Sequence, residues 1–392
     1  MLDNGGTFER HVMTKQVLPT IPPSSLDGSA ESDELAAKEL PVERLRKVIA
    51  EVDAEARPDQ RGRFLILTHR GPDPDAMGAC EGLRLMLSAG FGYEVIVATV
   101  GEIHRAENLA LLRTLELDLV PYGDVNADEF AGVLLVDTQP AFGHTVVPEG
   151  ALVAAVFDHH VPPPGKDEDR VQPRFEDVRL QTGATCSILY EYLRDSGLEV
   201  DSRTASALFC GVRYDTADLS RNASPLDEEA YHALFKLGDR EAIAAIDNPP
   251  LPRHYYRELT QALSSARQHG PLILILMGKV ENPESVAEMA DFFLRMRGCS
   301  LVLAGAAHGS EYILSLRTDY AFGKAYPLML RMLDGLGSFG GHGHIAGARV
   351  PLEDDGMSTI TAVERQMRAN ALEVIGAEDE DGIPPEGKSL AE

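Results

Sequence analysis

The chain has 392 residues, of which 44% are hydrophobic, so it is long enough for two ordinary domains that each bury a sizeable core. Its 36 basic and 62 acidic residues give a formal net charge of −26. This charge disfavours long nucleic acid, including long duplexes, as a partner, because such binding depends on many contacts between Lys or Arg side chains and phosphates. A small phosphorylated substrate is not excluded, since it can enter a locally positive cleft.

Two further features bear on the compartment. No stretch approaches the roughly 18 apolar residues of a membrane span, and residues 1–6 lack the basic and apolar regions of a signal peptide. The cysteines are widely scattered and fit neither a zinc knuckle nor a disulfide framework. They are Cys80, Cys186, Cys210 and Cys299. We therefore expect a cytoplasmic protein with reduced cysteines and no membrane partner.

The first half of the chain alternates between strand-like and helical patterns. Residues 1–40 carry runs of Pro, Ser and Gly, which predict a disordered N-terminal segment, and helical spacing at residues 39–49 opens the folded part. Strand-like runs follow at 64–68, 94–100, 132–136 and 152–157, and helical patterns at 75–90, 106–115, 182–197 and 202–211. Such alternation is typical of βαβ units. We predict an α/β domain over residues 41–246, built on a parallel sheet with helices on both faces.

The second half begins with a linker. The prolines of Asp247-Asn-Pro-Pro-Leu-Pro252 stop regular structure, so we predict a linker and bridging helix over residues 247–268. Strand-like runs at 272–277, 301–306 and 312–316 and helical patterns at 285–296 and 326–336 follow. They predict a smaller α/β substrate-binding domain over residues 269–352. Residues 353–392 are expected to form a C-terminal helix and an acidic tail.

Several segments of the first domain present Asp or His where an apolar run stops. They are His69 with Asp73 and Asp75 after residues 64–68, Asp137 after 132–136, Asp158-His159-His160 after 151–157, and Asp215 at the end of 208–215. Because the carboxyl ends of parallel strands meet at one edge of a sheet, these side chains are expected to lie close together. A single Asp at a strand end is usually a turn or capping residue, so the prediction rests on the ordered combination.

Carboxylates and imidazoles without thiolates favour manganese, magnesium or iron over structural zinc. Two such ions roughly 3.5–4 Å apart clamp a phosphoryl group and lower the pKa of a bound water. Such a pair needs a shared carboxylate. Asp137 lies between the other clusters in the sequence and is the predicted bridge.

These motifs resemble the DHH phosphoesterase family. The resemblance covers about residues 45–350 and includes Gly340-Gly341-His342 with Ala346-Gly347, which is similar to the glycine-rich motif of the DHH-associated C-terminal domain. It implies one metal held by His69, Asp73 and Asp137, and a second held by Asp75, Asp137, His159 and Asp215. It also implies that His160 faces the scissile phosphate while Asp158 orients a neighbouring imidazole. Pro74 and Tyr214 depart from the family pattern without removing a ligand.

The resemblance implies a two-metal phosphoesterase, with Mn²⁺ the expected ion and Mg²⁺ the alternative. The two-domain layout is similar to short-oligoribonucleotide exonucleases and 3′-phosphoadenosine 5′-phosphate phosphatases, so the expected substrate is a short oligoribonucleotide or a nucleoside bisphosphate. Cyclic-dinucleotide and inorganic-polyphosphate hydrolases share the motifs and stay open, as does a metal-binding regulatory module without turnover. A homodimer is a further open alternative. Low Phe and Tyr content and the absence of Trp leave few candidates for base stacking.

Substrate contacts are predicted mainly in the second domain. The backbone of Gly340 and Gly341 can approach a phosphate closely, and His342 is expected beside it; the alternative is a plain turn. Arg317 is expected to grip a phosphate, with a surface ion pair as the alternative. Contact with substrate also stays open for three further residues. His344 is otherwise an incidental turn residue, His104 a solvated residue at a helix start, and Arg221 a helix-capping residue.

Overall fold

The computed structural model describes residues 39–162, 171–376 and 387–391. The disorder predicted for residues 1–38 and the acidic run 378–381 lie outside these ranges. The chain divides into two compact units, one ending at Pro249 and the other comprising residues from Pro250 onward together with residues 104–106. Among the described residues, no helix is both long and apolar enough to cross a membrane.

The first unit is built on six parallel strands in the order β3-β2-β1-β4-β5-β6. Their bounds are β1 Arg63–Leu67, β2 Glu94–Thr99, β3 Leu119–Pro121, β4 Gly132–Val136, β5 Val153–Asp158 and β6 Phe175–Val178. The short edge strands β3 and β6 were not predicted, because neither carries a long apolar run. The central strands are buried on both sides, which explains their continuous hydrophobic sequences.

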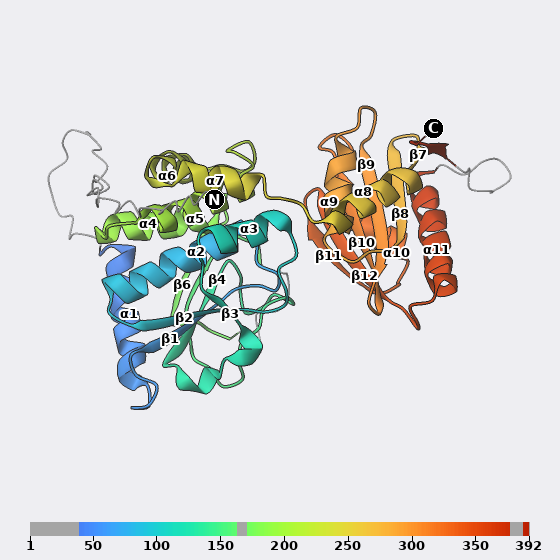
Figure 1. Ribbon diagram of the computed structural model, residues 1–392. Coiled ribbons are helices and arrows are strands. Elements are labelled where there is room, and N and C mark those ends of the chain that lie inside the picture. The colour runs from blue at the N-terminus through green and yellow to red at the C-terminus, as the bar shows by residue number, and fades with distance from the viewer. Residues whose placement is uncertain (1–38, 163–170, 377–386, 392) are drawn as a thin grey trace, which may run out of the picture. The chain divides into compact units, whose positions relative to one another are not determined.

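The α-helices of this unit lie on one side of the sheet, where the last two pack mainly on other helices instead of on the strands (Figure 1). They are α1 Pro41–Glu55, α2 Pro74–Leu85, α3 Ala106–Thr114, α4 Thr185–Ser196, α5 Ser202–Asp215, α6 Pro225–Leu237 and α7 Arg240–Asp247, and α2 continues into the π-helical turn η1 Met86–Gly90. Side chains alternate along β1, so Phe64 and Ile66 join the helical core and Leu65 and Leu67 face the other side. That side is covered by loops and by the short 3-10 helices η2 Tyr122–Asp124 and η3 Ala127–Glu129.

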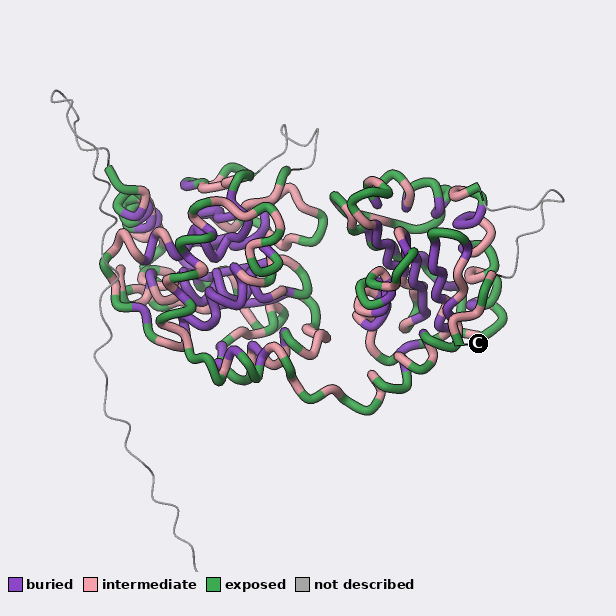
Figure 2. The backbone as a smooth tube through the Cα atoms, turned by 90° about the horizontal axis from the view of Figure 1, so that it is seen from above, coloured by how far each residue is buried: buried purple, intermediate pink, exposed green. Residues whose placement is uncertain are grey.

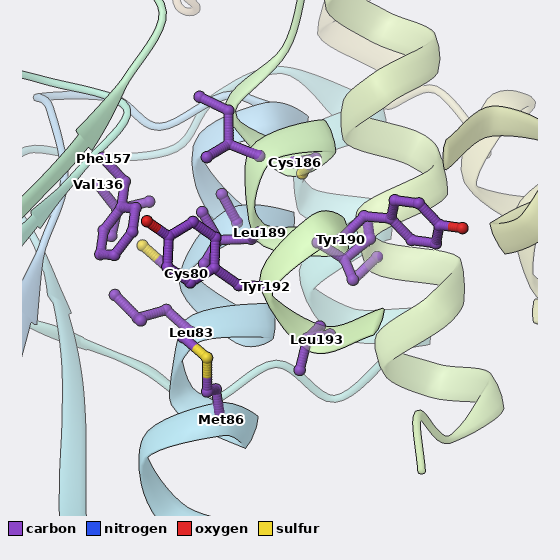
Figure 3. Packing of buried hydrophobic residues seen from close by; sticks show 14 of the residues in the cluster. Cys80, Leu83, Met86, Val136, Phe157, Cys186, Leu189, Tyr190, Tyr192 and Leu193 are labelled. Atoms are coloured by element: carbon purple, nitrogen blue, oxygen red, sulfur yellow. The ribbon is translucent and has the colours of Figure 1, made fainter. Parts of the chain in front are cut away.

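The core between sheet and helices is tightly packed. Figure 3 shows Leu83 and other α2 side chains beside α4 residues, around Phe157 of β5, and the rings of Phe157 and Tyr192 meet edge to face at 5.2 Å between centroids. Figure 2 shows the buried residues gathered inside each unit. Helices α2 and α5 cross closely because Gly78 and Gly211 lack side chains; a Cβ at Gly211 would lie 2.9 Å from the Cα of Asp75.

The strand order reverses between β1 and β4, which makes their carboxyl ends a topological switch point. From β1 the chain passes through α2 on the helical face to reach β2. From β4 it passes through residues 137–152 on the opposite face to reach β5, with Val147 and Ala151 packed there. The two connections run in opposite directions across the sheet. Because parallel-strand crossovers are right-handed, they must lie on opposite faces. Neighbouring strands whose connections diverge in this way leave a gap in which ligands bind.

The second unit is a seven-stranded mixed sheet in the order β11-β12-β10-β9-β8-β7-β13. The strands are β7 Arg267–His269, β8 Leu272–Lys279, β9 Leu301–His308, β10 Glu311–Thr318, β11 Ser338–His342, β12 Ile345–Pro351 and β13 Lys388–Ser389. Helices α8 Arg253–Ser265 and α9 Ser285–Leu294 pack on one face, and α10 Ala325–Leu333 and α11 Met357–Ile375 on the other. The predicted fold class, a parallel-sheet α/β domain followed by a smaller α/β domain, is therefore confirmed. The predicted helices on both faces of the first sheet are not found among the described residues: α-helices cover one face, and the other carries loops and short 3-10 helices, because the connection over residues 137–152 contains no α-helix.

Candidate metal centre

The predicted ligands of the first unit converge at the strand ends. The chain leaves β1 and β4 at His69 and Asp137, and β5 ends at Asp158, followed by His159 and His160. The N-terminus of α2 contributes Asp73, which caps the helix, and Asp75, while α5 ends at Asp215. Three sets among them have ligand atoms within 4.8 Å of one another: His69, Asp73 and Asp137; Asp75, His159 and Asp215; and Asp137, His159 and His160.

Asp137 lies between the two halves of this cluster. Its Oδ2 is 3.5 Å from Nε2 of His69, and its Oδ1 is 3.6 Å from Nε2 of His159. The same His159 nitrogen is 3.1 Å from Oδ2 of Asp215 and 3.9 Å from Oδ2 of Asp75. One carboxylate thus faces an imidazole on each side, which is the geometry a bridging ligand requires.

Among the described residues, two polar atoms at the centre of the cluster are buried and have no hydrogen-bond partner of good geometry: Oδ2 of Asp137 and Nε2 of His159. Buried polar atoms are nearly always satisfied, because an unpaired one keeps its full desolvation cost. A cation placed among these oxygen and nitrogen donors would satisfy both atoms. The donor set, with carboxylates and imidazoles and no thiolate, suits a hard divalent ion. The residues therefore fit a divalent metal site.

The N-terminus of α4 fixes two of the carboxylates. The backbone N–H groups of Thr185 and Cys186 donate to Oδ2 and Oδ1 of Asp75 at 2.6 and 2.8 Å. The Thr185 hydroxyl donates to Oδ1 of Asp137 at 2.8 Å. A helix N-terminus favours negative charge, so α4 stabilises the acidic side of the cluster. Sequence reasoning missed Thr185, because a hydroxyl residue at a helix start signals ordinary capping.

Asp137 also has an unusual backbone. Its φ of 56° lies in the left-handed region, which Asp adopts more readily than most non-glycine residues. Its N–H donates to the carbonyl of Phe157 at 2.8 Å, which extends the pairing of β4 with β5 by one bond. The left-handed conformation ends the strand directly after that bond, at the residue whose carboxylate lies between His69 and His159.

Electrostatics in the metal-free protein favour protonated imidazoles. Burial alone would lower the pKa of His69, but the close Asp137 carboxylate and the charge of Asp73 outweigh it and raise that pKa to about 9. Burial likewise opposes the charged form of His159, while Asp215, Asp137 and Asp75 raise its pKa to about 11. Burial, with the charges of Asp215 and Asp137, raises the pKa of Asp73 to about 6. Protons thus occupy the positions that a cation would take.

His160 is held by a buried network that sequence reasoning saw only in part. Its Nδ1 lies 2.9 Å from Oδ1 of Asp158, which is fully buried. Gln139, also fully buried, donates from Nε2 to Oδ2 of Asp158 at 2.7 Å and to the His160 carbonyl at 2.8 Å. Gln139 therefore orients the carboxylate that orients the imidazole. The sequence around Gln139 does not single it out, because the residue is uncharged and belongs to no regular hydrophobic pattern.

The residues predicted to bind substrate in the second unit lie on β10 and β11, the two strands that flank β12. Arg317 on β10 and His342 on β11 both pair in register with Ile345 on β12. Arg317 is only 7% exposed, and its guanidinium donates to Asp291 and to Oγ of Ser315. Gly341 has a φ of 152°, and a Cβ there would lie 2.6 Å from Cα of Ala346, so this position needs glycine. Gly340, in contrast, has open space around it.

The remaining candidates have clear structural partners. Nδ1 of His344 lies 3.1 Å from both the Gly323 carbonyl and Oγ1 of Thr318, so this histidine ties the hairpin to a loop. The Arg221 guanidinium donates to the Asp215 carbonyl at 2.7 and 2.9 Å, which matches the capping alternative. His104 lies just before α3, which begins at Ala106.

Comparison with known proteins agrees with this site. Residues 63–212 match the model of the DHH family, N-terminal domain, a range that ends three residues before Asp215. An uncharacterized protein of Methanocaldococcus jannaschii is 30% identical over 332 residues, which cover 82% of this chain. The match covers 66% of that relative, so the chain spans just under two thirds of its length.

Two solved structures are also similar. An exopolyphosphatase-related protein from Bacteroides fragilis aligns with a TM-score of 0.64 at 15% identity, covering 85% of this chain and 98% of that one, and it shares the fold. RecJ from Thermus thermophilus, in complex with Mn²⁺, aligns with a TM-score of 0.48 at 17% identity, covering 85% of this chain and 55% of that one. The family match, the parallel sheet and the strand-end ligands lead to one conclusion: residues 63–212 form a DHH family N-terminal domain.

Proposed function

We propose that this protein is a phosphoesterase that depends on two divalent metal ions. The observation that carries the proposal is the position of Asp137, whose two carboxylate oxygens face His69 on one side and His159 on the other. When bound, a pair of such ions supplies an activated water and neutralises charge that develops on the phosphoryl group. DHH family membership of residues 63–212 supports the same reaction class.

The proposed ligands divide into two sets that share one residue. His69, Asp73 and Asp137 hold one ion, and Asp75, Asp137, His159 and Asp215 hold the other. Oδ2 of Asp137 belongs to the first set and Nε2 of His159 to the second, so each set contains a ligand atom that has no hydrogen-bond partner among the described residues. We propose Mn²⁺ as the working ion, with Mg²⁺ as the alternative.

His160 is proposed to act on the phosphate. Asp158 accepts the proton on Nδ1, and we propose that the other ring nitrogen, Nε2, faces the substrate. Burial lowers the pKa of His160, but the hydrogen bond to Asp158 and the charge of Asp137 raise it above its usual value. A protonated Nε2 would donate to a nonbridging or leaving oxygen and stabilise its negative charge.

The proposed substrate is a short oligoribonucleotide or a nucleoside bisphosphate. The net charge of −26 opposes long strands, and short substrates expose fewer phosphates to that repulsion. We propose that residues 269–352 act as the DHH-associated C-terminal domain and bind the substrate's far phosphate through Gly340, Gly341 and His342. Arg317 would first have to release Asp291 or Ser315, so its proposed contact is the more costly one.

A length series of 5′-labelled RNAs, from about two to about twenty nucleotides, tests this proposal with Mn²⁺ and then Mg²⁺ present. We expect kcat/KM to fall steeply with length, and to do so at moderate salt as well, where surface charges are screened. Equal or better cleavage of the longest RNA would overturn the short-substrate proposal. Release of phosphate from polyphosphate alone, or cleavage of cyclic dinucleotides alone, would identify one of the alternative hydrolases. Two tightly bound ions with no hydrolysis of any compound would favour a regulatory module.

A further inference from the structure

The loop that follows Asp137 carries two aromatic side chains next to the metal centre that the proposed reaction does not use. The ring of Phe142 lies 5.3 Å from that of His144, with 31° between their planes, so the two rings are roughly parallel. His144 stands perpendicular to His69 at 5.7 Å, and Phe142 perpendicular to His160 at 6.3 Å. The pair therefore adjoins both the proposed ligand His69 and the imidazole proposed to face the phosphate.

The loop is held by several hydrogen bonds, so the position of the two rings is defined. The Phe142 N–H donates to the Gln139 carbonyl at 3.0 Å, and the Thr145 N–H donates to the Phe142 carbonyl at 3.2 Å. The Arg70 N–H donates to the His144 carbonyl at 3.0 Å, which ties this loop to the one that carries His69. The hydroxyl groups of Thr138 and Thr145 also contact each other. A pair of rings fixed in this way can bind a flat group without first becoming ordered.

The pair is accessible to a ligand. His144 is exposed and Phe142 is half-buried. Buried aromatic residues in this unit pack into the core, as Phe157 and Tyr192 do, whereas these two lie on a loop outside the core clusters. A flat ring with an exposed face is the surface on which a nucleobase stacks, and any base can use it because every base has a π-face.

We propose that Phe142 and His144 form a stacking surface for the nucleobase of the nucleotide whose phosphate occupies the metal centre. This inference rests on the proposed function and deepens it, because it assigns the substrate class. The substrate must carry an unpaired base next to the reacting phosphate. Polyphosphate has no flat group and gains nothing from the pair, whereas a short oligoribonucleotide or nucleoside bisphosphate does. The contact is sequence-tolerant, since it uses the faces of bases and not their edges.

The test compares AMP with ribose 5-phosphate, which has the same sugar and phosphate but no base. Binding of each to the full-length, Mn²⁺-loaded protein is measured by calorimetry. Stacking on an aromatic residue is worth roughly 1–3 kcal/mol per base, so we expect AMP to bind the unaltered protein about tenfold or more tightly than ribose 5-phosphate. The variants Phe142→Leu and His144→Ala should lose most of that advantage while binding ribose 5-phosphate as before.

Controls separate stacking from a general disturbance. Phe142→Tyr keeps the ring and should keep the AMP advantage, and Phe235→Leu removes a ring that is 38% exposed elsewhere in the same unit, on α6, and should change nothing. Bound manganese and melting temperature are measured for every variant. Equal affinity of the unaltered protein for the two ligands, or an AMP advantage that survives both substitutions together, would overturn the inference.

A separate assay of pApA hydrolysis distinguishes this failure from failure of the proposed function. If the protein hydrolyses pApA but binds AMP no more tightly than ribose 5-phosphate, the proposed phosphoesterase function stands and the stacking inference is wrong. If the protein hydrolyses no phosphoester but binds AMP more tightly in a way that depends on Phe142, the stacking inference stands and the proposed reaction is wrong.

Discussion

The hydroxyl of Thr185 donates to Oδ1 of Asp137 at 2.8 Å, while Oδ2 of the same carboxylate has no hydrogen-bond partner among the described residues. One oxygen is thus held by Thr185, and the other is the one that we propose binds a cation. Thr185 lies 48 residues away from Asp137 in the sequence and is fully buried. The relationship connects the first turn of α4 to the end of β4, and it fixes the orientation of the carboxylate that we propose as the bridge.

Replacing Thr185 with Val removes the hydroxyl and keeps the branched shape. Loss of a residue that orients a metal ligand typically costs 10- to 100-fold in metal affinity, so we expect a weakening of about that size for Mn²⁺ binding by Thr185→Val. Thr185→Ser retains the hydroxyl and serves as the control. Calorimetric titration of the metal-free variants provides the measurement, and equal affinities of the Val and Ser variants would show that the hydrogen bond is unimportant.

Asp137→Asn should abolish hydrolysis and reduce bound metal from about two ions per chain, because a neutral amide is a poor bridge between two cations. Asn is preferred to Ala here, since it tolerates the left-handed backbone of this position. The exposed Asp124→Asn changes the net charge equally and should retain both ions. Elemental analysis after desalting measures the metal, and two ions retained by the Asp137 variant would refute the bridging role.

Gly211→Ala should destabilise the first unit and weaken metal binding together. The added Cβ would collide with Sγ of Cys186 and lie 2.9 Å from Cα of Asp75, so α5 must move away from α2 and carry Asp215 with it. Overpacking of this kind costs about 1–3 kcal/mol. Gly123→Ala, which has open space around it, should be near neutral. Urea unfolding in chelator and Mn²⁺ titration measure the two effects, and an unchanged midpoint would argue against the close crossing.

The loop after Asp215 contains three consecutive left-handed residues, Ala217, Asp218 and Leu219, with φ values of 47°, 53° and 64°. The left-handed conformation costs an alanine roughly 1–2 kcal/mol of conformational free energy. Glycine avoids this cost, but it loses more backbone entropy than alanine on folding, so the net gain is smaller. Ala217→Gly should therefore raise the free energy of unfolding by up to about 1 kcal/mol. Ala244→Gly, in the exposed middle of α7, should lower it by about the same amount. A destabilised Ala217 variant in urea unfolding would contradict this account.

The metal-free protein should become less stable as pH rises from 6.5 to 9. The pKa of His69 is raised to about 9 and that of His159 to about 11, both above the usual 6.5. Their protonated forms therefore contribute stability that is complete below pH 6.5 and is lost as pH rises through those values. The pKa of Asp73 is raised from 3.8 to about 6, so its protonated form also contributes stability, which is lost as pH rises between these two values.

Thermal melts between pH 6.5 and 9 measure this loss, with and without saturating Mn²⁺. Bound metal replaces the protons, so the melting temperature of the loaded protein should change less over this range. A pH-independent melting temperature in chelator would show that these imidazoles are not protonated in the metal-free fold.

The sequence by itself determined the class of the fold and which Asp and His side chains come together at the strand ends. Apolar runs such as residues 132–136 predict buried strands, and their alternation with helical patterns predicts a parallel sheet. Polar residues at the ends of such runs, of which Asp137 is the clearest, predict a ligand site at the carboxyl edge. These inferences succeed because hydrophobic periodicity is a local property that can be read along the chain. The edge strands β3 and β6 were not predicted, because their short sequences contain few apolar residues.

Tertiary structure alone decided which residues support the ligands. Thr185, Gln139 and the pair Phe142 and His144 have no sequence pattern that distinguishes them from capping, loop or surface residues. The roles that we propose for them depend on the strand order and on the close crossing of α2 and α5, which bring distant segments together. The physical reason is that a hydrogen bond or ring contact depends on distances of a few ångströms between residues far apart in the chain, and only the packed core sets those distances.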